Sequence, residues 1–241
     1  MQKLTASEIK FIKSLSRGKD RDAAGMFVVE GEKMVREALE SSFEVVAVYR
    51  RDEIGEQAMS RISSLSSPSP ALAIVRQRPR PDKAEVPSRG LFLMLDSVRD
   101  PGNMGTILRI CDWFGVDGVY ASPLSVDIYN PKVVQATMGA IFRVNFQYTE
   151  LEPFAADVLK HNGKIYGTFL DGDDIYSRSL DTGKESPSFI VMGNESEGIS
   201  PGLSSLVGER LFIPSYGSGL CESLNVAVAT AVTVAEFRRR G

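Results

Sequence analysis

The sequence predicts an α/β protein with two domains. Short β-prone runs alternate with stretches of helical periodicity along most of the 241 residues. Residues 91–95 form an almost continuously apolar run, which is typical of a parallel strand covered on both faces. Residues 76–90 contain three prolines and many charges but little apolar content, which is typical of a linker. We therefore predict a small α/β domain over residues 1–75, a linker over 76–90 and a larger domain with a mostly parallel sheet over 91–241.

The predicted elements of the first domain alternate in type. The spacing of apolar residues predicts helices at residues 7–15, 32–39 and 54–65. Runs of β-prone residues predict strands at residues 27–29, 43–49 and 71–75. Strands that alternate with helices imply layers of helix and sheet.

The second domain continues this alternation and ends in an unusually apolar helix. Strands are predicted at residues 91–95, 116–121, 143–148, 164–170, 188–192 and 211–213, and helices at 105–114, 131–139 and 151–161. A last helix is predicted from about Leu224, with Ser223 as its N-cap. Residues 226–235 are nearly all Ala, Val and Thr, so apolar side chains face every direction. We expect this helix to be buried, in its own subunit or in a partner's.

Composition excludes several classes of protein. No apolar run reaches the ~18 residues of a membrane helix, and the N-terminus lacks the apolar core of a signal peptide. Cys111 and Cys221 lie in unrelated contexts, which indicates free thiols in a reducing compartment. The chain has no Cys/His cluster, and the acidic run 171–174 fits no calcium loop. We therefore expect a cytoplasmic protein with no metal.

The single histidine, His161, does not indicate acid–base catalysis. It follows a predicted helix, and Asn162 or Gly163 is expected to reverse the chain there. A cation near the negative end of a helix is the role that this position favours. A mechanism that needs a histidine base therefore has no support in this sequence.

Basic residues gather in two places although the formal net charge is −3. The cluster in the predicted linker contains Arg76, Arg78, Arg80, Lys83 and Arg89. The cluster at the C-terminus contains Arg238, Arg239 and Arg240. These side chains form either a solvated linker and tail or local contacts to phosphate, which need basic patches and not a basic total.

Two loops after predicted strands carry candidate functional residues, since open parallel sheets bind ligands at the carboxyl ends of their strands. In the first loop Asn103 is a helix cap or a site residue, and capping is favoured on local grounds. Arg109, one turn into that helix, is a surface residue or a group that grips phosphate. In the second loop Gly193 allows a ligand to approach the backbone, and Glu195 points into the cleft, whereas Glu197 is an ordinary loop acid.

A third loop partly matches a dinucleotide-binding pattern. Gly217 and Gly219 follow a predicted strand and precede the last helix. The third glycine is missing, because its place is taken by Glu222, and no later strand carries an acid for a ribose. A nucleotide-dependent oxidoreductase is therefore a weak alternative.

Taken together, the three loops resemble the motifs of the SpoU (TrmH) family of RNA ribose methyltransferases, in the SPOUT superfamily. The matching segments are residues 103–115, 193–198, 213–214 and 222–229. The resemblance covers residues 91–241, and the first domain resembles more loosely a ribosomal-protein-like substrate-binding domain. It implies a trefoil-knotted α/β domain, S-adenosylmethionine as cofactor, a homodimer formed through the knot domain, and RNA as substrate. Such knots are otherwise essentially absent from proteins.

The resemblance also assigns roles to residues. The implied cofactor site comprises Gly193, Gly198, Ile213 and Leu224, with Thr168 and Leu170 as a nearby wall. The implied catalytic residues are Asn103, Arg109, Glu195, Ser223 and Asn225. Arg109 matches an arginine that acts on cofactor bound mainly by the other subunit. Because a guanidinium stays protonated, stabilising the developing alkoxide or holding the adjacent phosphate is an easier role than that of a base.

The implied reaction is transfer of a methyl group to a ribose 2′-hydroxyl, and its RNA is not fixed by any residue. Ribosomal RNA is favoured by family habit, with transfer RNA as the alternative. A further alternative is a non-catalytic RNA-binding or assembly factor that retains the knot. The five catalytic candidates are present in the sequence, which argues against it.

Overall fold

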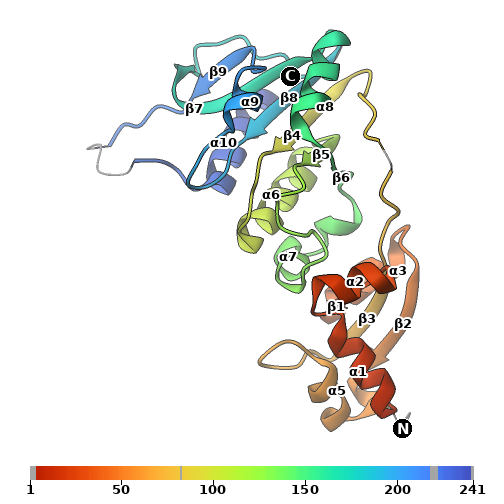
Figure 1. Cartoon of the computed structure of the whole chain (residues 1–241). Coiled ribbons are helices and arrows are strands. Elements are labelled where there is room, and N and C mark those ends of the chain that lie inside the picture. Colours follow the sequence, from red (N-terminus) through yellow and green to blue (C-terminus); the bar gives the residue numbers. More distant parts are fainter. Residues whose placement is uncertain (1–3, 82, 218–221, 240–241) are drawn as a thin grey trace. The chain divides into compact units, whose positions relative to one another are not determined.

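The computed structural model describes residues 4–81, 83–217 and 222–239 (Figure 1). Gly219, Cys221 and Arg240, which the sequence singled out, lie outside the described residues. The chain forms two compact units: Met1–Pro79 with Asp127–Arg143, and Arg80–Val126 with Val144–Gly241. The chain therefore passes between the units after residues 79, 126 and 143. No pattern in the sequence indicated that residues 127–143 leave the second unit and return to it.

The first unit contains a three-stranded antiparallel sheet in the order β1-β3-β2. Its strands are β1 (Met26–Glu30), β2 (Val45–Arg50) and β3 (Ala71–Arg76), and its N-terminal helices are α1 (Ala6–Ser14), α2 (Gly18–Ala24), α3 (Glu32–Glu40), α4 (Arg51–Ile54) and α5 (Glu56–Ile62). The predicted alternation of helix and strand is confirmed. The predicted helix over 54–65 is instead two helices separated by Gly55, whose φ of +87° interrupts the helical backbone. Helix α2 was missed because its one buried side chain is Arg21, so it shows no apolar period.

Arg21 binds residues 127–143, the segment that returns to the first unit. This segment contains α7 (Pro131–Thr137) and the short 3₁₀ helix η1 (Ala140–Phe142). The Arg21 guanidinium is almost fully buried and donates to Asp127 Oδ2 at 2.5 and 3.2 Å. It also donates to the carbonyls of Leu15 and Ser16, at 3.1 and 2.8 Å. Every hydrogen-bonding nitrogen of this buried cation thus has a partner.

The second unit contains a six-stranded sheet in the order β6-β5-β4-β8-β7-β9, and all of its paired strands are parallel. Its strands are β4 (Gly90–Leu95), β5 (Gly118–Ala121), β6 (Phe146–Tyr148), β7 (Lys164–Asp174), β8 (Pro187–Met192) and β9 (Glu209–Phe212). The predicted fold class, a small α/β domain followed by a domain with a mostly parallel sheet, is confirmed. The central strands β4 and β8 are buried along almost their whole length, as the apolar run at 91–95 indicated.

Helices cover both faces of this sheet. Helices α8 (Leu151–Lys160) and α9 (Pro201–Ser204) pack on the face that carries Phe92, Met94 and Phe189. Helix α10 (Val226–Arg239) covers the other face, where Phe237 contacts Tyr166 with ring centroids 4.9 Å apart. Helix α6 (Pro101–Phe114) lies beside α10 (Figure 1), and Arg238 Nε donates to Phe114 O at 2.8 Å.

The predicted linker is not a free segment along its whole length. Four of its cations contact residues of their own unit: Arg76 pairs with Glu44, Arg78 stacks on Phe43, Arg80 stacks on Tyr148, and Lys83 pairs with Asp157. Ala84 is buried in the core of the second unit, and Val86 packs against it. Arg76, Arg80, Lys83 and Arg89 are exposed, as the solvated-linker interpretation expects, whereas Ala84 shows that part of this segment belongs to the core of the second unit.

Other sequence-based expectations can also be compared with the structure. His161 ends α8, and Asn162 reverses the chain with a φ of +57°, as expected. Cys111 is buried in the core, and this burial raises the pKa of its thiol. Cys111 is therefore not expected to act as a nucleophile. In the acidic run, Asp171 pairs with Arg210 at 2.6 Å and Asp173 with Arg178 at 3.6 Å. Within the described part of the chain, no helix is both long and apolar enough to cross a membrane.

Candidate active site

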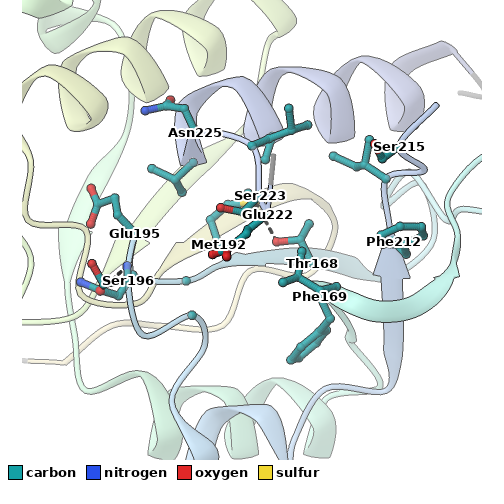
Figure 2. A pocket seen from close by; sticks show the side chains of 18 of the residues that line it. Thr168, Phe169, Met192, Glu195, Ser196, Phe212, Ser215, Glu222, Ser223 and Asn225 are labelled. Carbon is teal, nitrogen blue, oxygen red and sulfur yellow. Dashed lines mark hydrogen bonds between the residues drawn. The ribbon is translucent and has the colours of Figure 1, made fainter. Parts of the chain in front are cut away.

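One pocket lies at the carboxyl ends of β8 and β9, beside the middle of β7 (Figure 2). Its volume is about 440 Å³, and it is lined by residues 168–170 of β7, by the ends of β8 and β9 with the loops that follow them, and by the start of α10. All six residues predicted to hold the cofactor line it: Thr168, Leu170, Gly193, Gly198, Ile213 and Leu224. Three predicted catalytic residues, Glu195, Ser223 and Asn225, line it as well. Motifs that are distant in the sequence thus contribute to one cavity.

Segments from two sides form the walls of this pocket. Figure 2 shows Glu195 on one side, Phe212 and Ser215 on the other, and Thr168 and Met192 between them. Thr168 Oγ1 donates to the carbonyl of Val191 at 3.4 Å, across the β7–β8 pair. The floor of the pocket is therefore part of the rigid sheet, whereas its sides are loops.

The loop after β8 is closed by its own backbone. Asn194 and Gly198 exchange two backbone hydrogen bonds, of 2.9 and 3.0 Å. A Cβ at Gly193 would lie 2.3 Å from the carbonyl carbon of Gly198. We expected this glycine to let a ligand approach, but the structure shows that the loop itself already leaves no room for a side chain. A valine at position 193 would therefore distort the loop and would not test ligand binding cleanly.

A hydrogen-bonded network joins three predicted catalytic residues. The Asn103 amide donates to Glu195 Oε1 at 2.9 Å, and the Asn225 amide donates to Asn103 Oδ1 at 2.9 Å. Donor and acceptor of Asn103 are thus both used, which sets the orientation of its amide. The favoured interpretation of Asn103 as a helix cap is wrong, because Asp100 caps α6 by accepting from Asn103 N at 2.8 Å.

Asn225 has a second role at the start of α10. Its Oδ1 accepts from the backbone of Ala227 at 3.0 Å and of Val228 at 3.3 Å. The helix begins at Val226, so the predicted N-cap at Ser223 and start near Leu224 are wrong. Ser223 does not cap the helix, and it is one of the residues that line the pocket.

Arg109 lies apart from the pocket of its own chain. It is exposed on α6, six residues after Asn103, which corresponds to about 9 Å along the helix axis. It is not among the described residues that line the pocket. Within one chain, four of the five predicted catalytic residues are therefore brought together, and Arg109 is not.

Sequence reasoning missed several residues that shape the site. Buried Asp96 accepts from Ser200 N at 2.7 Å, and the Asn194 amide donates to Ser97 O at 2.7 Å. These bonds join the loops after β4 and β8. Asp96 and Asn194 could have been noted as polar residues that follow apolar strands, but only the pairing of β4 with β8 makes them neighbours.

The charges of the lining suit a cationic ligand. Glu195 and Glu222 are the charged side chains among its described residues, and none of these residues is basic. Apolar wall is supplied by Leu170, Ile213 and Leu224. S-adenosylmethionine combines a cationic sulfonium and ammonium group with a flat adenine ring, so the residues present fit this cofactor.

The network around Asn103 leads to a prediction about activity. We expect Asn103→Asp to lower kcat/KM for methyl transfer by roughly 30- to 100-fold, because it removes a donor to a carboxylate and sets two acids against each other. Asn145→Asp is the matched control, because it makes the same change at an exposed residue before β6. Steady-state kinetics of both variants test this; equal activity of the two would contradict a role for the network.

Comparisons with known proteins agree with this geometry. Residues 90–235 match the SpoU rRNA Methylase family, and residues 6–73 match an MRM3-like substrate binding domain. The chain is 32% identical over 248 residues to the 23S rRNA (guanosine(2553)-2′-O)-methyltransferase RlmP of Bacillus subtilis, with 96% of each protein covered.

Solved structures show the same architecture over the whole chain. A TrmH-family protein from Porphyromonas gingivalis is 36% identical, with a TM-score of 0.88 and 99% of each chain covered. An rRNA methyltransferase from Sinorhizobium meliloti with bound AdoMet is 27% identical, with a TM-score of 0.86 over 99% of this chain and 97% of that one. The matched family model spans most of the second unit and more than half of the chain, and so this protein belongs to the SpoU rRNA methylase family.

Proposed function

We propose that this chain transfers a methyl group from S-adenosylmethionine to a ribose 2′-hydroxyl of large-subunit ribosomal RNA. The observation that supports the proposal is the pocket, where residues from separate motifs lie together at the carboxyl ends of the strands. The relative in Bacillus subtilis, which matches along the whole chain, is named for this reaction. The first unit is proposed to select the RNA, since residues 6–73 match a substrate-binding domain. The cytoplasm is the compartment proposed for this reaction.

The reaction is tested by mapping the product. We incubate the protein with S-adenosylmethionine and a 23S rRNA transcript. We expect methylation of one ribose, which makes the phosphodiester bond on the 3′ side of that ribose resistant to alkaline cleavage. A base methylation in place of a ribose methylation would contradict the chemistry. Methylation of transfer RNA but not of 23S rRNA would contradict the proposed substrate, and failure to bind S-adenosylmethionine would favour the non-catalytic alternative.

The cofactor is proposed to occupy the pocket, with Leu224 as part of its apolar wall. Leu224 is 48% exposed in this structure, so a bound adenine ring would remove apolar surface from water there. We expect Leu224→Ala to raise the Kd for S-adenosylmethionine roughly fivefold, measured by isothermal titration calorimetry. Leu159→Ala is the matched control, since Leu159 is 40% exposed on α8 and outside the pocket lining. An unchanged Kd for Leu224→Ala would argue against this placement.

The proposed mechanism depends on orientation and charge. S-adenosylmethionine supplies a methyl group on a cationic sulfur. Glu195, held by Asn103, and the hydroxyl of Ser223 orient the ribose or the methyl donor in the pocket. Arg109 stabilises the alkoxide that develops as the 2′-hydroxyl loses its proton to water, or holds the neighbouring phosphate while that phosphate takes up the proton. No titratable histidine takes part, because His161 lies at the end of α8 and its Nδ1 is 2.8 Å from Asp157 O.

A homodimer is proposed to bring Arg109 to the pocket of a second chain. Two observations support it: Arg109 is exposed and outside the lining of its own pocket, and α6 and α10 carry exposed apolar residues beside it. Trp113, one turn after Arg109, is 85% exposed, and Val228 is 50% exposed. The last helix thus keeps an exposed apolar residue within the chain, which a partner subunit would cover.

Subunit complementation tests the dimer. We expect Arg109→Ala and Glu195→Ala chains, each inactive alone, to recover roughly one quarter of wild-type activity when refolded together, because half of the dimers are mixed and each has one complete site. The separately refolded and then mixed proteins are the control. No recovery in the co-refolded sample would contradict an arginine supplied by the partner.

A trefoil knot is proposed for the second unit. It is supported by the path of the C-terminal segment, since β9 lies at the sheet edge beyond β7 while α10 returns to α6. An experimental structure that traces residues 214–226 outside the loop 193–200 would contradict it.

A further inference from the structure

The wall of the pocket at Leu170 belongs to an irregular part of β7. Both Thr168 and Asp173 pair with Leu211 of β9, so residues 169–172 have no partners on that strand. A Cβ at Gly172 would lie 2.6 Å from Arg210 O, so the end of this excursion is packed tightly against β9. Leu170, in its middle, lines the pocket and is 68% exposed. An exposed leucine on an unpaired segment needs something else to hold it in place.

Arg210 contacts the residues on both sides of Leu170. Its guanidinium carbon lies 3.4 Å from the centre of the Phe169 ring. Its Nη2 donates to Asp171 Oδ1 at 2.6 Å, and its Nη1 donates to Ser204 Oγ at 3.2 Å. The hydrogen bond from Arg210 lowers the pKa of Asp171. One side chain of β9 thus contacts both neighbours of Leu170 and is also bonded to Ser204, the last residue of α9.

The Phe169 ring also packs closely against the backbone of Gly167. A Cβ at Gly167 would lie 2.6 Å from Phe169 Cε2 and 3.1 Å from both Ile199 Cδ1 and Val207 Cγ1. The ring therefore lies over Gly167, between the core and the Arg210 guanidinium, and Figure 2 shows it extending away from Thr168. A planar cation on an aromatic face is a directional contact, unlike a point charge.

We propose that Arg210 is a positioning residue that holds Leu170 as a wall of the cofactor pocket. The inference rests on the proposed placement of S-adenosylmethionine in this pocket. It assigns no chemical step to Arg210, which is not among the described residues lining the pocket. Its role is to keep residues 169–171 in the conformation that presents Leu170 to the ligand, so its loss lowers affinity for the cofactor and leaves the chemical step intact.

The test measures S-adenosylmethionine binding to the full chain by calorimetry. We expect Arg210→Ala and Leu170→Ala each to raise the Kd about fivefold. The Kd of the double variant should be no higher than that of the single variant that binds more weakly. At saturating cofactor, kcat of Arg210→Ala should stay within about twofold of wild type, a split that general destabilisation would not produce. Arg178→Ala is the matched control, because it removes ion pairs to Asp173 and Glu209 on the same strands outside the pocket lining.

Two outcomes would overturn the inference: a wild-type Kd for Arg210→Ala, or effects of the two single changes that multiply in the double variant. If Arg210→Ala does not fold, as judged by circular dichroism, Arg210→Lys replaces it. Lysine keeps the charge but removes the planar stack on Phe169, so the Kd should rise, and an unchanged Kd would reject a positioning role for Arg210. If the wild-type protein itself does not bind S-adenosylmethionine, the proposed cofactor pocket fails, which is a different result from equal binding by wild type and variant.

Discussion

Replacing Arg109 by alanine is expected to lower kcat for methyl transfer by about 100- to 1000-fold, the effect of removing one preorganised group that stabilises transition-state charge. The Kd for S-adenosylmethionine should change little, because the proposed contacts of Arg109 are to the ribose oxygen or its phosphate and not to the cofactor. Single-turnover methylation of 23S rRNA and calorimetry of cofactor binding measure the two quantities separately.

The control for this variant is Arg178→Ala, which removes an arginine that lies outside the pocket lining and pairs with Asp173 of β7 and Glu209 of β9. Its activity should equal that of the wild type. Arg109→Lys distinguishes the possible roles of the guanidinium. A lysine keeps the charge but loses the planar fork, so partial activity would indicate charge stabilisation and complete loss would indicate bidentate contact with phosphate. Near-wild-type methylation by Arg109→Ala would show that the catalytic assignment is wrong.

Replacing Arg21 by alanine is expected to destabilise the protein by about 3 kcal/mol, because it leaves a carboxylate and two carbonyls without their donor. A loss of this size corresponds to a fall in Tm of roughly 6–12 °C for a chain of this length. Differential scanning calorimetry measures it. The expected cause is release of residues 127–143 from the first unit, since Asp127 at the start of this segment is the ionic partner of Arg21.

Arg17 offers a matched control for this second prediction. It also faces an acid, Asp20, at 2.5 Å, but its side chain is 64% exposed whereas that of Arg21 is 3% exposed. Surface ion pairs contribute little, so Arg17→Ala should melt close to the wild type. Equal effects of the two changes would show that burial does not set the strength of the Arg21 contact. Substituting Arg21→Met together with Asp127→Leu should recover much of the loss, since an apolar pair leaves no unpaired charge.

Where local pattern and burial agree, the sequence predicts the elements of the structure well. The apolar run at 91–95 becomes the buried strand β4, and helix α8 ends where Asn162 reverses the chain. Helix α2 and the short helix α9 were missed because neither has an extended apolar period. The start of α10 was placed too early, because Ser223 and Asn225 are both good caps and only the backbone path selects between them.

By itself, the sequence determined the α/β class, the parallel sheet and the family, because these depend on periodicity and on the order of short motifs. Only the tertiary structure decided that Asn103 bonds to Glu195 and Asn225 while Asp100 caps α6, since residues 92 and 122 positions apart meet only through strand pairing. It also decided that Gly193 is required by its own loop and that Arg210 grips both neighbours of Leu170. The physical reason is the same in each case: local sequence sets backbone preference, whereas side-chain contacts depend on which strand ends the sheet brings together.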